Sequence, residues 1–442
     1  MASVIIDPAP FFYRGSANPF ASVAAKIPHM NYKRIIIKKN REIPLVKGHP
    51  WLFSGALATV EKGIEPGEIV LATRSDGEKL GLGFFNDGAI AFRFLTDDFS
   101  AIINADFWRR RIRQAISLRK KIIPPDTDAY RLINAEGDNL PGLIVDRYRD
   151  CLALTIGTAG MDRWRDTMVA LLLEETGVKT IYERSEGRSR RLEGLADRIG
   201  AAFGVVPESM EVLENGLHFE VDIREGQKTG FFLDQRLNRE LVGRLSRGAA
   251  SVLNCFSYTG AFSLYAARGG ATRVVSVESS EPANGMAARN FNRNGINTQL
   301  HPILTADCFE YLRKTDEIYD MIILDPPAFA KSRKDVGHAA RAYKEINLQA
   351  ARRLADGGFL ATFSCSNFID EELFRKIVLG AVRDAGKTGQ VLSQLGAGSD
   401  HPVSLGHPEG RYLKGLLLCL PTHRKSGVWG KSVENGGPRS FK

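Results

Sequence analysis

From about Pro207 onward the chain alternates apolar runs with amphipathic stretches, and this alternation constrains the fold more than any other feature. The apolar runs include SVLNC, VVSVE, MIILD, FLATF and LKGLLLCL, and they are short and bounded by polar or turn-forming residues. Strands buried in a parallel sheet have this composition, and the stretches between them are typical of connecting helices. We therefore expect an α/β fold in which residues 207–421 form a doubly wound, Rossmann-like sheet, with a ligand site at the carboxyl ends of its strands.

Two smaller domains are expected before this sheet, because 442 residues exceed what one hydrophobic core usually organises. Residues 32–100 contain RIIIKK, EIVLATR, LGLGFF and AIAFRFL between Gly, Pro and Asp turns, the pattern of a small β-barrel. Residues 101–206 begin with a basic amphipathic helix over 103–122 and continue as a small α+β central domain. In that domain EGDNLPG indicates a tight hairpin, and we interpret residues 181–195 as a loop. We expect residues 1–31 to be a flexible extension and residues 422–442 a basic flexible tail.

The composition predicts a folded protein with an anionic partner. Hydrophobic residues make up 43% and charged residues 25%, which excludes a chain dominated by disorder. The formal net charge is +9, which favours a negatively charged partner, with the modest basic excess of an ordinary soluble enzyme as the alternative. Five cysteines without a CxxC pair indicate neither a zinc site nor a disulfide framework, so we expect no metal and a reducing cytoplasm. Neither a membrane-spanning run nor a signal-peptide core is found in the sequence.

Two segments are candidates for contact with nucleic acid. The stretch FWRRRIRQAISLRKKI has no acidic residue, and Arg110, Arg111 and Arg113 in it suit phosphate contact, with a solvated helix face as the alternative. The stretch GHPWLFSGAL places Lys47 and Trp51 close together, as an aromatic and basic surface would require. The alternative for Trp51 is a place in the core.

The loop after SVLNC is a candidate cofactor site. Residues 254–260 lead from an apolar run into a helix, and the absence of GxGxxG argues against a dinucleotide and favours a nucleoside cofactor without phosphates. Gly260 would let a cofactor approach the backbone. Glu278 ends the next strand and suits the ribose hydroxyls, and Asp307 ends a further strand and suits the adenine amine. Helix capping is the alternative for either carboxylate. The candidate cofactor ligands of this region are Asn254, Phe256, Tyr258, Gly260, Glu278 and Asp307.

The segment KTGFFLDQR combines unlike chemistries in a short stretch just before a helix. We predict that Phe231, Asp234 and Gln235 flank the methionine end of the cofactor, and that Lys228 and Arg236 contact the substrate. The alternative for Phe231 is a place in the core.

The predicted reaction centre combines two motifs at the same edge of the sheet. In IILDPPAFAKS a strand ends at Asp325, and two prolines then fix the backbone. Similar motifs in methyltransferases that act on planar nitrogens use the Asp to bind an amino group and an aromatic residue to stack on the base. In FLATFSCSN, Cys365 follows a strand, where a thiolate can add to carbon 6 of a pyrimidine and so activate carbon 5. The alternative for Cys365 is a small buried apolar side chain. Asp325 is a candidate catalytic residue together with Cys365 and also a candidate cofactor ligand. The candidate substrate contacts here are Pro326, Pro327, Phe329 and Lys331.

Residues 33–421 resemble the PUA-domain-containing cytosine-C5 methyltransferases of large-subunit ribosomal RNA. The resemblance rests on GHPWLFSGAL, EGDNLPGLIVDRY, GQKTGFFLDQR, FSYTGAFS, LDPPAFAKS, FSCSN, and DHP followed by EGRYLKGL, in that order. It implies a PUA domain that binds RNA, a central domain, a Rossmann-like domain that binds S-adenosylmethionine (SAM), and Cys365 as the nucleophile. The family commonly has Asp at the position of Glu278, and the longer carboxylate should still reach a ribose.

The expected activity is therefore SAM-dependent formation of 5-methylcytosine in large-subunit ribosomal RNA or its assembly intermediates, with a homodimer as a possible assembly. Two alternatives stay open at this point. One is a methyltransferase acting on a base nitrogen of guanine or adenine, with Cys365 incidental. The other is a noncatalytic RNA-binding assembly factor.

Overall fold

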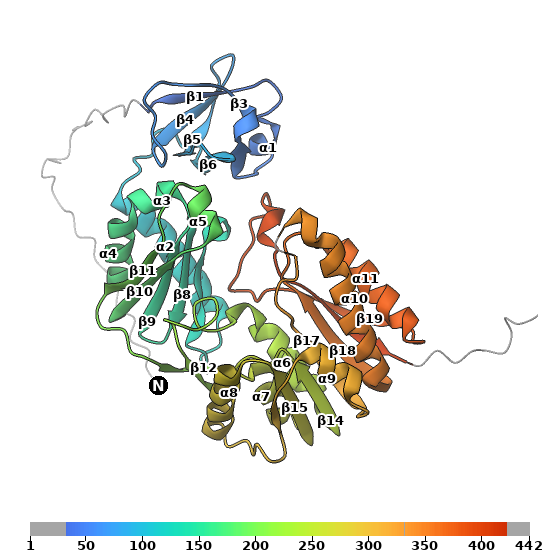
Figure 1. Ribbon diagram of the computed structural model, residues 1–442. Helices are drawn as coiled ribbons and strands as arrows, with labels where there is room; N and C mark the ends of the chain where they lie inside the picture. The colour runs from blue at the N-terminus through green and yellow to red at the C-terminus, as the bar shows by residue number, and fades with distance from the viewer. Residues whose placement is uncertain (1–31, 331, 422–442) are drawn as a thin grey trace, which may run out of the picture. The chain divides into compact units, whose positions relative to one another are not determined.

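The computed structural model describes residues 32–330 and 332–421. The expected extension over 1–31, the expected tail over 422–442 and Lys331 lie outside these described residues. The described residues from Lys33 to Pro421 form one compact unit. Its described part contains three main groups of secondary structure, each with its own sheet (Figure 1).

The first group is a six-stranded sheet with the order β2-β6-β5-β4-β1-β3. Its strands β1 and β4 pair in parallel and the other neighbours are antiparallel. Apolar side chains from alternate strand positions, such as Ile35, Val70 and Phe92, form its core. The expected small β-domain is confirmed, and β2 and β3 were not anticipated because they are very short. The elements are β1 (Arg34–Ile37), α1 (Ile43–Val46), β2 (Trp51–Phe53), β3 (Leu57–Val60), β4 (Ile69–Arg74), β5 (Lys79–Phe85) and β6 (Ile90–Thr96).

The second group is a five-stranded sheet with the order β11-β10-β9-β8-β7. The expected basic helix is α2 (Ala105–Ile122), which Asn104 caps by accepting a hydrogen bond from the backbone of Phe107. EGDNLPG lies in the hairpin between β7 and β8, as expected. The loop interpretation of residues 181–195 is wrong, because this stretch supplies most of β10 and all of α5. The remaining elements are β7 (Ala129–Asn134), β8 (Leu143–Tyr148), β9 (Cys151–Ile156), α3 (Ala159–Arg163), α4 (Arg165–Thr176), β10 (Thr180–Ser185), α5 (Arg188–Leu192) and β11 (Arg198–Phe203).

The third group begins with a hairpin and not with the expected alternation. Strands β12 (Met210–Glu214) and β13 (Leu217–Val221) pair in antiparallel register. The polar segment KTGFFLDQR follows, and its end forms a 3₁₀ turn over Leu233–Gln235 that leads directly into α6 (Arg236–Leu245). The alternation of strands and helices then starts at β14.

The large sheet has the order β16-β15-β14-β17-β18-β20-β19. The doubly wound arrangement is confirmed, except that β20 runs antiparallel to both β18 and β19. The elements are β14 (Ser251–Cys255), α7 (Ala261–Arg268), β15 (Arg273–Glu278), α8 (Glu281–Arg293), β16 (Ile303–Thr305), α9 (Cys308–Lys314), β17 (Tyr319–Leu324), α10 (Val336–Arg353), β18 (Leu354–Ser364), α11 (Glu371–Asp384), β19 (Gln390–Leu395) and β20 (Lys414–Leu420).

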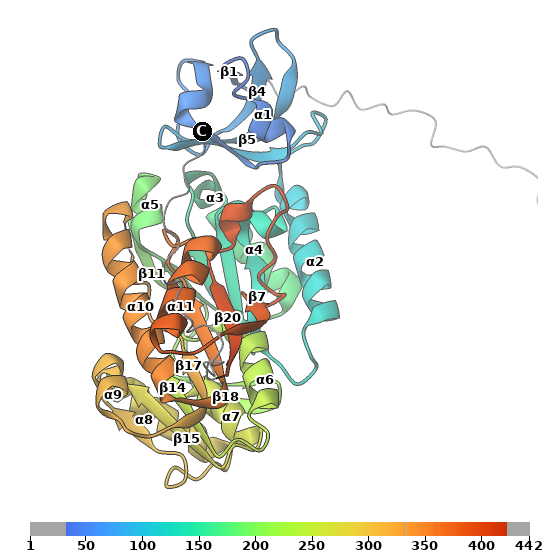
Figure 2. The same ribbon diagram turned by 90° about the vertical axis from the view of Figure 1, so that its right-hand side faces the viewer.

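Helices cover both faces of this sheet (Figures 1 and 2). In β17, Ile322 and Leu324 belong to the core under α9, α10 and α11, whereas Met321 and Ile323 belong to the core under α6 and α7. This two-residue alternation explains why the run MIIL is apolar throughout. The carboxyl ends of β14, β15, β17 and β18 consequently converge at one edge, which the segment before α6 also reaches.

Candidate active site

A cavity of about 290 Å³ lies at this edge of the large sheet. Its walls come from the segment before α6, the loop after β14, and the ends of β15, β17 and β18. The structure thus brings together most of the predicted site residues, although they are far apart in the sequence. Those that line the cavity are Lys228, Phe231, Asp234, Gln235, Phe256, Tyr258, Glu278, Asp325, Pro326, Pro327 and Cys365.

The carboxylate of Glu278 accepts a hydrogen bond from the backbone of the loop after β14. Phe256 and Tyr258 have left-handed φ values of 57° and 47°, so the backbone turns sharply within this loop. The amide of Tyr258 donates to Oε2 of Glu278 at 3.1 Å, and the amide of Ser280 donates to Oε1 at 2.9 Å. The carboxylate is fixed in this way at the cavity wall, where it can also accept hydrogen bonds from a ribose.

Asp325 stands directly after β17 and has an unusual charge state. Burial raises the pKa of its carboxyl from 3.8 to about 7, and the nearby charge of Asp234 contributes. Nε2 of Gln235 donates to Oδ2 of Asp325 at 3.0 Å, and the side-chain amide of Asn238 holds Oε1 of Gln235 at 2.6 Å. The orientation of Gln235 is therefore set from behind, and Asp325 can change protonation near neutral pH.

Asp234 is 2% exposed and belongs to a small charged network. Nζ of Lys228 donates to its Oδ2 at 2.6 Å, and the hydroxyl of Tyr412 donates to the same oxygen. Burial alone would raise the pKa of Asp234, but Lys228, His401 and Tyr412 hold it well below its ordinary value. Its Oδ1 has no hydrogen-bond partner among the described residues. A buried, ionised oxygen without a partner in the cavity wall fits the ammonium group of the SAM methionine.

Cys365 is partly buried and directly follows β18. Burial raises the pKa of its thiol, the charges of Asp325 and Asp234 raise it further, and Lys228 opposes them. The resting form is consequently the thiol. The ammonium group of Lys414 donates to the carbonyl of Ser366 at 2.7 Å and so fixes the turn that carries the cysteine.

Five predicted site residues do not line the cavity, namely Asn254, Gly260, Phe329, Arg236 and Asp307. Asn254 points from β14 toward α7, where it donates to Ser263 at 2.9 Å. Gly260 has a φ of 78°, and a Cβ there would lie 3.0 Å from Phe291 of α8, so packing and backbone geometry explain this glycine. The Phe329 ring packs on Tyr343 and Phe309 with centroids 4.7 and 5.9 Å away.

Arg236 is 1% exposed and pairs with Asp400 at 3.3 Å, so the prediction that it contacts substrate is wrong. The reason is helical phase, because Arg236 is the first residue of α6 and faces the protein interior. Asp307 caps α9 by accepting from the amide of Glu310 at 2.9 Å, which was the alternative for this residue, and it does not line the cavity.

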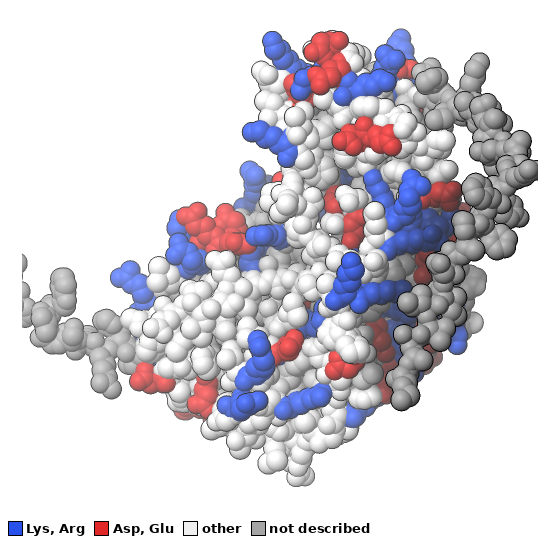
Figure 3. Space-filling model, turned by 180° about the vertical axis from the view of Figure 1, so that it is seen from behind, with Lys and Arg blue, Asp and Glu red and all other residues white. Residues whose placement is uncertain are grey.

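The expected basic stripe on α2 is interrupted. Arg111 is held internally, because its guanidinium donates to the carbonyls of Asn139 and Leu95. Arg113 is exposed but pairs with Glu175 at 2.7 Å. Arg110 is exposed and pairs with no acidic side chain in the part of the chain that the structure describes, so its contact with phosphate stays a prediction. On the face shown in Figure 3, Lys and Arg side chains likewise lie among acidic ones.

In the domain of the six-stranded sheet, Lys47 directly follows α1 and its side chain is exposed. Trp51 is partly buried, and its indole donates to Glu136 at 2.9 Å. Its ring lies 4.2 Å from that of His407 between centroids, and Arg93 lies over it at 5.1 Å. Protein contacts therefore occupy much of the Trp51 side chain.

The sequence interpretation missed several contributors to the site, among them two residues outside the cavity lining. Tyr412 and Asn238 support Asp234 and Gln235 from behind the cavity wall. Tyr412 lies in EGRYLKGL, a motif that the resemblance included without a role. Across the described ranges 32–330 and 332–421, no group of three or more His, Cys, Asp or Glu is placed to hold a metal ion. Likewise, no helix in these ranges is long and apolar enough to cross a membrane.

Comparison with known proteins agrees with this site. Residues 189–377 match the S-adenosylmethionine-dependent methyltransferase family, and residues 35–97 match the PUA-like domain family. A SAM-dependent methyltransferase from Streptococcus mutans has the same fold, with a TM-score of 0.75 at 24% identity over 88% of this chain and 100% of that one. Another methyltransferase structure, solved with S-adenosylhomocysteine, gives a TM-score of 0.76 with the same identity and coverage. The fold and the cavity thus define a SAM-dependent methyltransferase.

Relatives with higher identity give the particular family. The ribosomal RNA large subunit methyltransferase I of Shewanella amazonensis is 42% identical over 390 residues, which cover 87% of this chain and 98% of the relative. The protein of that name from Aeromonas salmonicida is 41% identical over the same coverage. The chain belongs to the ribosomal RNA large subunit methyltransferase I family.

Proposed function

We propose that this protein transfers the methyl group of SAM to carbon 5 of a cytosine in large-subunit ribosomal RNA, with Cys365 as the nucleophile. The observation that carries the proposal is the presence of Cys365 and Asp325 in the walls of one cavity, which Glu278 and Asp234 also line. Methylation of an amino nitrogen needs no cysteine, whereas the ring carbon must first be made nucleophilic.

The chemistry divides among few side chains. The Cys365 thiol gives its proton to water, and the thiolate forms a bond to carbon 6 of the cytosine. The electron pair of the carbon 5–carbon 6 double bond then moves into the ring system, which makes carbon 5 nucleophilic. Bound SAM supplies the methyl group that carbon 5 takes. A water molecule then takes the carbon 5 proton, the electron pair of that C–H bond restores the carbon 5–carbon 6 double bond, and Cys365 leaves as the thiolate. Lys228 favours the thiolate, since its charge opposes the effect of burial.

Asp325 is the proposed reader of the base edge. Its carboxylate accepts a hydrogen bond from the exocyclic amine of cytosine, while Gln235 holds the other side of the carboxyl group. Pro326 and Pro327 restrict the loop that carries this contact. Uracil presents a carbonyl oxygen at the same position, so it should be a poor substrate.

The target base has to leave its stack before Cys365 can reach carbon 6, because neighbouring bases cover both faces of the ring. The protein should therefore prefer single-stranded or looped RNA. Large-subunit ribosomal RNA is the proposed substrate because the family name specifies it and a PUA-like domain precedes the catalytic region. Mapping of ribosomal RNA methylation by mass spectrometry, in cells with and without the protein, identifies the base and the position.

Covalent trapping tests the mechanism directly. RNA that contains 5-fluorocytosine at the target cannot lose a proton from carbon 5, so the protein should form an adduct that survives denaturation. Cys365→Ser should form no adduct while it binds SAM within a few fold of the wild type. Methyl transfer by Cys365→Ser at the native rate, or to a base nitrogen, would show the alternative chemistry.

A further inference from the structure

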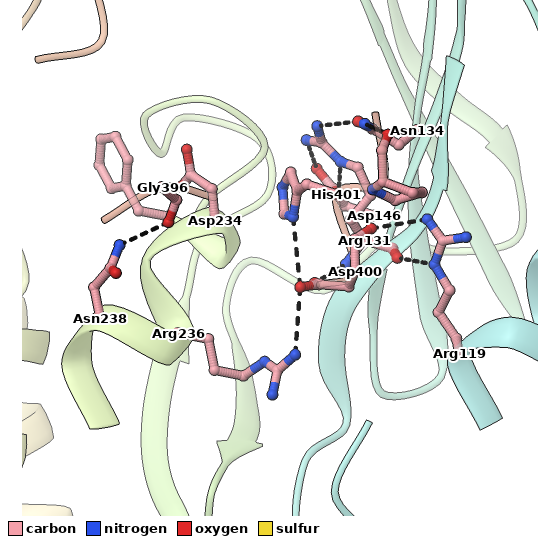
Figure 4. Close-up of polar contacts among 12 residues, drawn as sticks. Arg119, Arg131, Asn134, Asp146, Asp234, Arg236, Asn238, Gly396, Asp400 and His401 are labelled. Carbon is pink, nitrogen blue, oxygen red and sulfur yellow. Dashed lines mark hydrogen bonds and ion pairs between the residues drawn. The ribbon is translucent and has the colours of Figure 1, made fainter. Parts of the chain in front are cut away.

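The segment over residues 396–402, between β19 and β20, joins the five-stranded sheet of the central domain (β7 to β11, the central sheet) to the cavity wall (Figure 4). Asp400 is fully buried in it and His401 is 5% exposed. The DHP motif formed by Asp400, His401 and Pro402 therefore lies inside the protein, and the methyltransferase chemistry described above gives it no role.

One end of this segment is held by the central sheet. The amide of Arg131, in β7, donates to Oδ2 of Asp400 at 3.0 Å, and Arg119 of α2 donates to the main-chain oxygen of Asp400 at 2.8 Å. The side chain of Asn134 donates to the carbonyl of Pro402 at 2.9 Å. A Cβ on Gly137 would lie 1.9 Å from that carbonyl, so the two segments are in close contact.

The other side of Asp400 faces helix α6. Nη2 of Arg236 lies 3.3 Å from Oδ1 of Asp400, and Nδ1 of His401 lies 3.5 Å from the same oxygen. Burial alone would raise the pKa of Asp400, but His401, Arg236 and the amide of Arg131 hold it well below its ordinary value. The ionised carboxylate therefore links β7 and α6.

The start of the same segment contacts the cavity wall. The amide of Gly398 donates to the carbonyl of Asp234 at 2.9 Å, and Asn238 donates to the carbonyl of Gly396 at 2.9 Å and to Gln235 at 2.6 Å. The turn that carries Asp234 and Gln235 is thus attached to the segment that Asp400 anchors.

The central sheet also contacts the loop over residues 228–235, which carries Asp234 and Gln235. Asp146, in β8, pairs with Arg131 at 2.7 Å and accepts a hydrogen bond from the hydroxyl of Thr229 at 2.6 Å. Thr229 stands next to Lys228, which is paired with Asp234. The loop over residues 228–235 is therefore fixed at both ends by contacts that involve the central sheet.

We propose that Asp400 is a positioning residue for SAM: its buried carboxylate fastens residues 396–402 between β7 and α6, and so sets the place of Asp234 in the cofactor site. The central domain accordingly contributes to cofactor affinity although it supplies no side chain to the cavity wall. The inference depends on SAM binding and not on the base or atom that is methylated.

The test is SAM binding by isothermal titration calorimetry, because Asp400 acts on the site only through Asp234 and its neighbours. Asp400→Asn alone leaves Arg236 as an unpaired buried cation, which can unfold the protein. The informative variant is therefore the double change Asp400→Asn with Arg236→Met, which removes both charges. It should keep the native circular dichroism spectrum and raise the SAM dissociation constant at least tenfold.

A double-mutant cycle separates positioning from a general loss of stability. If Asp400 acts through Asp234, the double change should raise the dissociation constant less than twofold further when Asp234→Asn is already present. The matched control is Arg190→Met with Asp162→Asn, which removes an ion pair between buried Arg190 and partly buried Asp162, 2.9 Å apart, that does not touch residues 228–235. The control should bind SAM like the wild type.

Three results would overturn the proposal: an increase below tenfold, an effect that multiplies fully with Asp234→Asn, or an equal effect of the control. Should the double variant fail to fold, Asn238→Ala provides the same test, since it removes the link between Gly396 and Gln235 without a change of charge. It must then weaken SAM binding and show the same lack of multiplication with Asp234→Asn, or the proposal fails.

Discussion

Asp325→Asn is expected to stabilise the protein more at pH 8.5 than at pH 5.5. The pKa of this carboxyl rises from 3.8 to about 7 on folding, chiefly through burial. A rise of about 3 corresponds to about 4 kcal/mol, at 1.36 kcal/mol for each unit of pKa. The folded state therefore binds the proton more tightly than the unfolded state. Stability from this group falls as the pH rises from about 4 to about 7, and above pH 7 the full cost of the buried charge is present.

The magnitude follows from the fraction of folded protein that keeps the proton. At pH 8.5 the ionised carboxylate costs about 4 kcal/mol, whereas at pH 5.5 protonation recovers about 2 kcal/mol of this. An asparagine carries no charge at either pH. The gain in unfolding free energy from Asp325→Asn should therefore be about 2 kcal/mol larger at pH 8.5, whatever the substitution does to packing.

Urea unfolding followed by far-UV circular dichroism at the two pH values measures this difference. Asp316→Asn is the control, because Asp316 is fully exposed and makes only a surface ion pair with Arg353. Its effect on stability should be the same at both pH values within about 0.5 kcal/mol. Equal gains for Asp325→Asn at pH 5.5 and 8.5 would refute the account of a raised pKa. We also expect this variant to lose methyl transfer, because the proposed base reader is gone.

Three further predictions concern the cofactor, the thiol and the RNA. Glu278→Ala should raise the SAM dissociation constant roughly 10- to 150-fold, since a charged hydrogen-bond partner contributes about 1.5–3 kcal/mol, and unchanged affinity in calorimetry would remove Glu278 from the site. Iodoacetamide should alkylate Cys365 at pH 8.5 more slowly in Lys228→Met and faster in Asp325→Asn, because the two charges act on the thiol in opposite directions; the reverse order would contradict this electrostatic account. RNA affinity should fall as the salt concentration rises, and Arg110→Glu should make the slope of log affinity against log salt less steep by about 1. A slope identical to that of the wild type would show that Arg110 is a solvated surface residue.

Sequence patterns alone predict the parallel part of the large sheet and the edge at which the site lies. Apolar runs that are buried on both faces leave few alternatives to parallel strands between helices, and parallel strands bring their carboxyl ends together. Glu278, Asp325 and Cys365 were therefore predictable as neighbours, because each follows such a run directly. When a Gly, Pro or charged residue directly follows a strand, the local sequence is enough to predict that this residue lies at the end of the strand.

Packing between distant segments sets the direction in which the neighbouring side chains point, and it brings in the residues that support them. Arg236 and Phe329 stand in the motifs that surround the cavity, yet helical phase turns Arg236 toward Asp400, and the Phe329 ring packs into the core beside Tyr343. A short motif does not contain this information, because it depends on the elements packed against it. The direction of β20 was hidden for a similar reason, since an apolar run reads the same in a parallel or an antiparallel strand. Tyr412 contacts Asp234 across 178 residues of chain, and Asp400 reaches Arg236 across 164, so only the folded chain shows that these groups share one site.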